Sequence, residues 1–201
     1  MEPEERARLE KLDAILRSDE LRAKIYPVVD RVCAALSQQP EALMTWEPIP
    51  LEIFGQGLPQ EIRSGWVFVL HAGADTGAER HPNSHQRMMT LHGTGDMRVR
   101  GLHDESSTRA TSSPWKSNVL VSEASAPLER RWISIPPNVW HRPVVGNDAD
   151  WVVVSFHTVP AEELIEEKLD EAEGELKRKK YVEEEGGRSK NLKGRMERMG
   201  E

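Results

Sequence analysis

Residues 73–93 read GADTGAERHPNSHQRMMTLHG, and this stretch decides the predicted fold. In an extended strand alternate side chains share a face, so Glu79 and His81 point the same way. The Pro82-Asn83-Ser84 segment is typical of a turn. The residues that follow, QRMMTL, can form the return strand of a hairpin. The stretch therefore predicts two short neighbouring strands whose polar side chains meet.

A second segment, PPNVWH at residues 136–141, ends on a histidine just after a Pro-Pro turn. Two adjacent strands would direct Glu79, His81 and Gln86 to one point, and His141 is the natural fourth contributor from a distant strand. Imidazole nitrogens and carboxylate or amide oxygens are the groups that bind metal ions in proteins. The sequence therefore predicts a metal site.

The two segments resemble the two sequence motifs of the cupin superfamily, small jelly-roll barrels that usually hold one divalent metal. The first motif begins and ends with glycine. Its spacing places Glu79 at the first family His, His81 at the second and Gln86 at the family Glu. The second motif is Pro-x-Gly-x-x-His, and here it ends at His141 with Asn138 in place of the glycine. Both residue types tolerate a left-handed turn.

The resemblance covers residues 62–158 and implies a mainly β fold, a double-stranded β-helix or jelly-roll barrel. It also implies one divalent metal ion, held by Glu79, His81, Gln86 and His141. This set keeps the single negative charge of the usual family ligands, because the carboxylate has moved to the first position and a neutral amide takes its former place. Two imidazoles and one carboxylate suit iron, and they also accept manganese, nickel or zinc.

Two alternatives to this ligand set remain open. In the first, Glu79 forms a salt bridge with a neighbouring arginine, Gln86 is an ordinary polar strand residue, and no metal binds. In the second, His85 joins His81 and His141 in a site of three imidazoles. If His85 is not a ligand, it is the candidate acid or base, because histidine titrates near neutral pH.

The expected pocket-lining residues are Met88, His92 and Trp115. Met88 and His92 share strand parity with Gln86, so they would face the barrel interior. Trp115 lies in a long polar insertion, residues 103–118, between the two motifs and would cover the barrel mouth. Loops of that length are uncommon unless they carry function or are mobile.

Composition restricts the class of protein. The chain has 201 residues, enough for one domain with a sizeable core. Its net charge of −7 argues against nucleic acid and anionic membrane as main partners. The single cysteine, Cys33, excludes an internal disulfide framework and suits a reducing cytoplasm. No apolar run reaches membrane-spanning length, and the charged N-terminus is unlike a secretory signal. We therefore expect a cytoplasmic protein.

The chain divides into five segments. Residues 1–39 show helical periodicity, and residues 40–65 form a loop-rich connector with an edge strand expected at 51–54. Residues 66–158 form the barrel, with short strand candidates between Gly, Pro, Asn and Ser turns. Residues 160–185 open with Pro160 and repeat apolar residues at steps of four and three, which predicts a C-terminal helix. Residues 186–201 have little apolar content and should be disordered.

These observations predict a small-molecule metalloenzyme in which the metal polarises an oxygen-bearing substrate. Two imidazoles and one carboxylate leave open positions, which favours an oxygenase over an isomerase or a lyase. The alternative is a ligand-binding or sensory barrel without turnover, and a third possibility is a scaffold whose metal is structural. Open sheet faces and the apolar stripes of the helices predict a homodimer.

Overall fold

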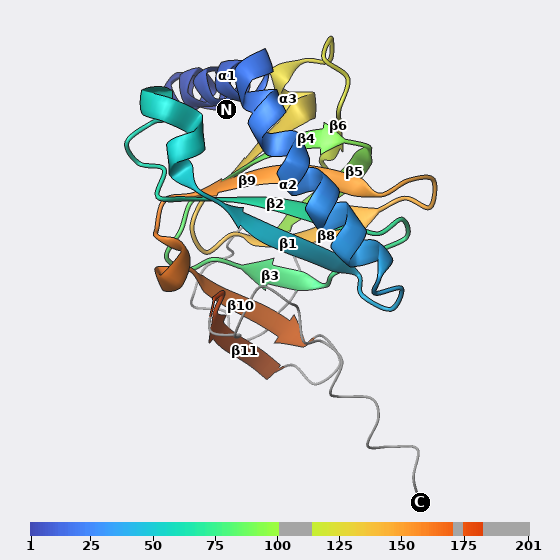
Figure 1. Ribbon diagram of the computed structural model, residues 1–201. Helices are drawn as coiled ribbons and strands as arrows, with labels where there is room; N and C mark the ends of the chain where they lie inside the picture. Colours follow the sequence, from blue (N-terminus) through green and yellow to red (C-terminus); the bar gives the residue numbers. More distant parts are fainter. Residues whose placement is uncertain (101–113, 171–174, 183–201) are drawn as a thin grey trace, which may run out of the picture.

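The computed structural model describes residues 1–100, 114–170 and 175–182. Two antiparallel sheets face each other, and the N-terminal helices cover the outer face of one of them (Figure 1). The space between the sheets is the barrel interior. This arrangement confirms the mainly β jelly-roll fold that the sequence predicts. No helix in the described part of the chain is long and apolar enough to span a membrane.

Two helices, α1 (Pro3–Leu16) and α2 (Asp19–Ser37), form the N-terminal segment as predicted. Ser18 separates them, and its side-chain oxygen accepts a hydrogen bond from the backbone N–H of Leu21, which caps α2. Pro27 lies inside α2 without ending it. The apolar stripes of both helices are buried against the sheet, through Leu9, Leu12, Leu16, Leu21, Ile25, Val28, Val29, Val32 and Leu36.

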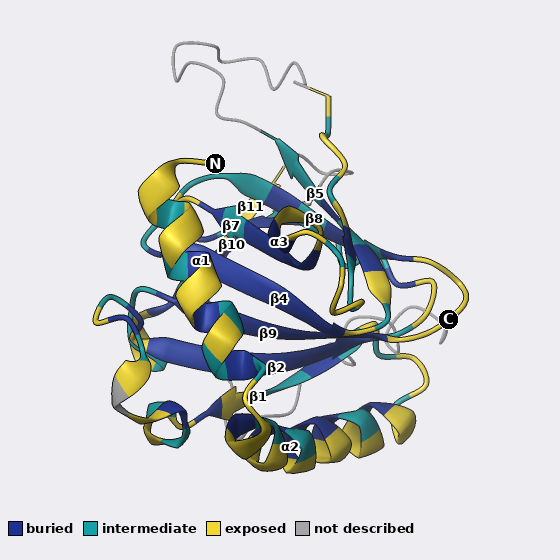
Figure 2. Ribbon diagram, turned by 90° about the horizontal axis from the view of Figure 1, so that it is seen from above, coloured by how far each residue is buried: buried dark blue, intermediate teal, exposed yellow. Residues whose placement is uncertain are grey.

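The sheet beneath the helices has five strands. Their order is β1 (Met44–Ile49), β2 (Ser64–Leu70), β9 (Trp151–His157), β4 (Gln86–His92) and β7 (Trp132–Ile135). The central strands are buried along almost their whole length, as Figure 2 shows, because helices cover one face and the second sheet covers the other. Such double coverage explains why these strands read as continuous apolar runs rather than as an alternating pattern.

The second sheet has six strands. Their order is β11 (Glu175–Lys180), β10 (Ile165–Asp170), β3 (Ala78–Arg80), β8 (Trp140–Val145), β5 (Thr94–Arg100) and β6 (Val119–Val121). A short helix, α3 (Leu128–Arg131), precedes β7. Inward-facing side chains of both sheets form one apolar cluster, which includes Trp66, Met88, Met97, Leu120, Val145 and Trp151.

The connector at residues 40–65 differs from its prediction. The strand in it is β1, at residues 44–49, and Leu51–Gly57 form a 3-10 helix, so the strand expected at residues 51–54 is wrong. Pro48 fits the edge position of β1, because proline has no N–H to donate to a second neighbour. Phe54 packs its ring 5.2 Å from that of Phe156, under the helices. This burial and the break at Pro50 favour a turn over strand pairing.

The predicted helix over residues 160–185 is wrong. Residues Ala161–Glu163 form one turn of 3-10 helix, and the chain then enters an antiparallel hairpin made of β10 and β11. β10 pairs with the edge of β3, which sets Lys168 opposite Glu79 and Glu167 opposite Arg80. Strand hydrogen bonds and the burial of acidic side chains beside basic partners outweigh the helical repeat of apolar residues.

The strands that carry the first motif are not hairpin partners, contrary to the prediction. β3 lies in the six-stranded sheet between β10 and β8, whereas β4 lies in the five-stranded sheet between β9 and β7. The turn that begins at Pro82 therefore crosses from one sheet to the other. Glu79, His81 and Gln86 still meet, because the two strands face each other across the barrel and their side chains line one cavity.

Two predictions concern residues that lie wholly or largely outside the described part of the chain. The disordered tail predicted at residues 186–201 lies outside the described residues. Of the polar insertion at residues 103–118, only the end from residue 114 onward is described.

Candidate metal centre

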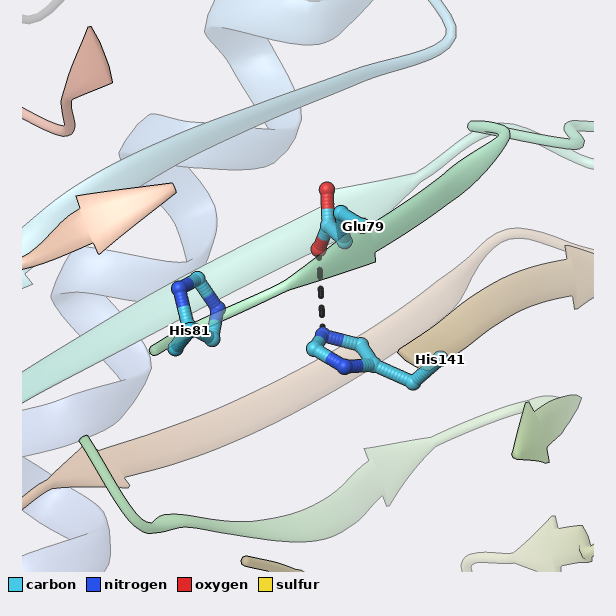
Figure 3. A group of neighbouring side chains, drawn as sticks. All are labelled: Glu79, His81 and His141. Carbon is cyan, nitrogen blue, oxygen red and sulfur yellow. Dashed lines mark ion pairs between the residues drawn. The ribbon is translucent and has the colours of Figure 1, made fainter. Parts of the chain in front are cut away.

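Three side chains from β3, its C-terminal end and β8 converge inside the barrel (Figure 3). Glu79, His81 and His141 each offer one ligand atom, and these atoms lie within 4.8 Å of one another. Glu79 and His141 are directly paired across β3 and β8. Ligand atoms bound to one metal at about 2.1 Å lie at most about 4.2 Å apart. Only small side-chain movements therefore separate this group from a metal-binding arrangement.

Backbone carbonyls fix the tautomers of both histidines. His81 Nδ1 lies 3.0 Å from the Ile165 carbonyl oxygen, and His141 Nδ1 lies 3.2 Å from that of Val139. A carbonyl oxygen only accepts hydrogen bonds, so Nδ1 carries the proton in each ring. The Nε2 atoms therefore keep their lone pairs, as metal-binding imidazoles do.

Several buried polar atoms in this region have no hydrogen-bond partner. They are Glu79 Oε2, His141 Nε2 and Gln86 Oε1. The side-chain nitrogen of Gln86 donates to Ser155 Oγ at 3.1 Å, so its oxygen is left unpaired. Buried polar atoms seldom lack partners in folded proteins. Three of the four predicted ligands thus each present an atom that accepts no hydrogen bond, and a cation already lies 3.5 Å from that of Glu79 in the form of Lys168 Nζ. This arrangement fits a site built for a cation.

The charges of the site suit metal binding at neutral pH. Burial alone would raise the pKa of the Glu79 carboxyl, but the positive Lys168 and the neighbouring His141 outweigh it and hold this pKa well below its usual range. Burial, together with the neighbouring His141, lowers the pKa of His81 to about 4. An ionised carboxylate and a neutral imidazole are the forms that coordinate metals.

Lys168 is a functional candidate that the sequence did not reveal. Its Nζ lies 3.5 Å from Glu79 Oε2 and 3.9 Å from Glu166 Oε1. Burial disfavours its charge, but the two carboxylates outweigh that effect and raise the pKa of Lys168. The predicted C-terminal helix hid this contact, because only the pairing of β10 with β3 brings Lys168 opposite Glu79.

His157 is a second residue that sequence reasoning left unassigned. Its ring lies 5.0 Å from that of His81, centre to centre. Its Nδ1 is 3.2 Å from Ser84 Oγ and its Nε2 is 3.2 Å from Ser155 Oγ, the hydroxyl that also accepts from Gln86. Both ring nitrogens are engaged, so His157 supports the site rather than binding a metal. Strand parity with Trp151 and Val153 was the available signal.

A small cavity adjoins the candidate ligands. It leaves about 30 Å³ for the centres of water molecules, room for about one or two of them. Met88 lines it, as predicted. The polar part of its wall is Glu79, His81, Gln86 and His157, and the rest includes Met44, Phe68, Leu70, Met97, Pro143, Trp151, Val153 and Tyr181.

His85 lies away from this group. Its Nε2 is 2.6 Å from Ser134 Oγ and 3.7 Å from Glu5 Oε1 of α1. Neighbouring residues of a strand face opposite sides, so Gln86 points into the barrel while the side chain of His85 is turned toward α1. Among the described residues, His85 does not join the three gathered side chains, and the site of three histidines is not formed.

The structure also corrects two of the expected pocket-lining residues. His92 is exposed and its ring lies 5.6 Å from that of Tyr26 in α2. The register between β4 and β9 shifts between Thr90 and His92, and this bulge reverses the expected parity. Trp115 lies beneath the guanidinium of Arg100, 4.7 Å from ring centre to Cζ, and does not line the cavity.

The neighbourhood of His85 anchors α1 to the sheet. Arg87 Nε and Nη2 donate to the two carboxylate oxygens of Glu5 at 2.7 and 2.9 Å, and Ser134 Oγ donates to the same carboxylate at 2.6 Å. Burial alone would raise the pKa of Glu5, but these donors outweigh it and lower the pKa to about 2. Glu5 is therefore ionised over the whole neutral and mildly acidic range.

This cluster predicts a pH dependence of stability. The folded-state pKa of Glu5 is about 2, below its ordinary value of 4.5. Such a carboxylate stabilises the fold fully above its unfolded pKa, and the contribution is lost as the pH falls toward the folded pKa. Between about pH 6 and about pH 3, the wild type should lose about 1 to 2 kcal/mol more than Glu5→Gln. Urea unfolding at both pH values measures this difference. Equal losses in the wild type and in Glu5→Gln would show that the ionised Glu5 carboxylate does not stabilise the fold.

The comparisons with known proteins concern the fold. No family model matches the sequence, and no curated protein matches it. CapF, a capsular polysaccharide assembling protein from Staphylococcus aureus, matches with TM-score 0.42 and 12% identity over 68% of this chain and 32% of that chain. An oxalate oxidase in complex with glycolate gives TM-score 0.41 and 16% identity over 58% of this chain and 51% of that chain.

An oxalate decarboxylase from Lactobacillus farciminis gives TM-score 0.42 and 13% identity over 59% of this chain and 29% of that chain. The present chain thus spans about a third of CapF and about half of the oxidase. Its fold is assigned from its own strand order. That order confirms the jelly-roll fold that the two motifs predict, and Glu79, His81 and His141 lie together inside the barrel.

Proposed function

We propose that this chain binds one divalent metal through Glu79, His81, Gln86 and His141 and acts as a small-molecule metalloenzyme. One contact carries the proposal: His141 Nε2 faces the Glu79 carboxylate at 3.4 Å, while its Nδ1 proton is turned to a backbone carbonyl. Two buried acceptors that face each other repel unless a cation lies between them. A second proton on His141 would satisfy Glu79 alone, whereas a metal ion would also satisfy the unpaired oxygen of Gln86.

A metal held here would polarise an oxygen-bearing ligand, and iron would add redox chemistry. The residues of the chain position the ligand groups. Lys168 keeps Glu79 ionised, backbone carbonyls orient the two imidazoles, and Ser155 fixes the amide of Gln86. Most of the cavity wall is apolar, and the small volume limits the water beside the ligands to about one or two molecules.

An oxygenase is favoured over an isomerase or a lyase, because two imidazoles and one carboxylate are the set that leaves iron open positions. Oxygen uptake by the iron-loaded chain distinguishes these reactions. The homodimer and the cytoplasmic location stay predictions.

A ligand-binding barrel without turnover is the second candidate. The observation that favours it is the ion pair between Lys168 and Glu79, since an ammonium group can balance the carboxylate without a metal. In that case the four residues would bind a polar molecule directly. The two candidates differ in whether the purified chain carries a metal.

The role of Gln86 is tested by changing its charge. Gln86→Glu restores the carboxylate of the family motif and adds a second negative charge beside Glu79, so it should preserve or strengthen metal binding. The gain should be largest for hard cations such as Mn²⁺, about tenfold or more. Calorimetric titration with Mn²⁺ and Zn²⁺ measures both affinities.

His85→Ala is the matched control, because His85 directly precedes Gln86 and its side chain contacts Ser134 and Glu5 instead of the cavity. It should change either affinity by less than about threefold, a difference below about 1 kcal/mol. Loss of metal in His85→Ala, with no change in Gln86→Glu, would reverse the assignment.

A further inference from the structure

Tyr181 directly follows the C-terminal hairpin, and its side chain lies in the barrel interior. All six residues of β11 are exposed, whereas Tyr181, the next residue, is only 7% exposed. Its backbone N–H donates to the Leu164 carbonyl at 2.8 Å, which ties the end of the hairpin to its beginning. The hairpin therefore holds one aromatic side chain in place at the barrel interior.

The Tyr181 ring fills the space between the two sheets. Its centre lies 5.2, 5.4 and 6.1 Å from those of Trp46, Trp66 and Phe68 on β1 and β2. On the other side it lies 6.3 Å from the ring of His81, a candidate ligand. Contacts at these separations stabilise an aromatic cluster. Tyr181 is thus packed between the wall of the five-stranded sheet and the candidate metal centre.

This packing leaves little room beside the candidate ligands. Tyr181 lines the same cavity as Glu79, His81 and Gln86, and that cavity leaves about 30 Å³ for the centres of water molecules. Such a volume admits about one or two waters, whereas a cavity of about 150 Å³ accepts a benzene-sized molecule. Most of the other walls belong to strands paired on both sides, such as β2, β9 and β4. Tyr181, by contrast, stands at the end of an edge strand.

We propose that Tyr181 determines the size of the molecules that reach the metal centre, so that its ligand or substrate is an oxygen-bearing molecule of only a few heavy atoms. This inference rests on the proposed metal site. Charge favours an anion: a divalent metal and Lys168 supply three positive charges, against one negative charge on Glu79 and at most one on Glu166. The phenol of Tyr181 acts here through its bulk and not through its hydroxyl.

Cobalt-loaded full-length chain tests the size limit, because the visible absorption of Co²⁺ changes when a new ligand enters its coordination sphere. Azide and benzoate are suitable probes, since both carry one negative charge and they differ in size. The wild type should respond to azide and not to benzoate. Tyr181→Ala and Tyr181→Leu should bind benzoate about tenfold or more tightly than the wild type, with azide affinity changed by less than about threefold.

Two control variants isolate the role of bulk. Tyr181→Phe removes the hydroxyl, keeps the ring and should still exclude benzoate. Leu176→Ala shortens a side chain of β11 that is 50% exposed, so it should leave both responses unchanged. Tyr181→Leu decides the question should Tyr181→Ala fail to fold by circular dichroism.

The outcomes separate the two proposals. Equal benzoate binding by wild type and Tyr181→Leu would overturn the role of Tyr181 and leave the metal site intact. The same conclusion would follow if cobalt-loaded Tyr181→Leu responded to azide alone. A wild-type chain that takes up no cobalt would overturn the metal site and, with it, the inference about Tyr181.

Discussion

His141→Ala should reduce the affinity for divalent metal at least about a hundredfold, because loss of a supporting residue alone commonly costs about 10- to 100-fold. The variant removes one of two imidazoles and leaves His81 with two oxygen ligands. The cavity left behind is buried, since His141 is 1% exposed, so no other side chain replaces the ring without rearrangement. His81→Ala should have a similar effect. Competition with a chelator of known affinity measures the loss.

His85→Ala serves as the control, since it removes an imidazole that faces Glu5 and Ser134 instead of the barrel interior. It should retain the metal of the wild type. Full occupancy in both His141→Ala and His81→Ala would place the metal elsewhere and refute the proposed ligand set.

Gly93→Ala should lower the free energy of unfolding by about 2 to 4 kcal/mol, a sum of two effects. Gly93 closes the first motif and joins β4 to β5 with a φ of 73°, where a residue with a Cβ atom costs about 1 to 2 kcal/mol. A Cβ there would also lie 2.3 Å from the backbone oxygen of Asp150, so the loop before β9 would have to move. Thermal or urea unfolding measures the change.

Gly77→Ala is the matched control, because Gly77 has a φ of 80° but no atom within 4 Å of the position of a Cβ. It should lose only the conformational part, about 1 to 2 kcal/mol. Equal losses of stability in the two variants would show that the close approach of the Asp150 backbone oxygen does not contribute to the requirement for glycine at position 93.

Local patterns in the sequence were sufficient for much of the fold. The two helices follow from the apolar spacing of residues 1–39, and the side chain of Ser18 caps α2. Asn138, which stands where the family motif has glycine, has a φ of 65°, as a left-handed turn requires. Motif spacing selected Glu79, His81 and His141, and the structure brings these three together. Each of these features depends on residues close in sequence or on one spacing rule.

Features that depend on distant partners were not predictable in this way. The apolar spacing of residues 165–176 fits a helix, but Ile165–Asp170 form strand β10, which pairs with the open edge of β3. The bulge after Thr90 turns His92 outward, and one extra residue in a strand leaves no local signal. Lys168 reaches Glu79 only through the pairing of β10 with β3, so the helix predicted over residues 160–185 hid this contact.

The metal content of the full chain, purified without a chelator and without a histidine tag, tests the central claim most directly. Elemental analysis should find about one equivalent of iron, manganese, nickel or zinc per chain in the wild type and a small fraction of that in His141→Ala. A wild-type chain that carries no divalent metal, and takes up none when each of these ions is supplied, would contradict the account. Lys168 would then be the only cation at Glu79 among the described residues.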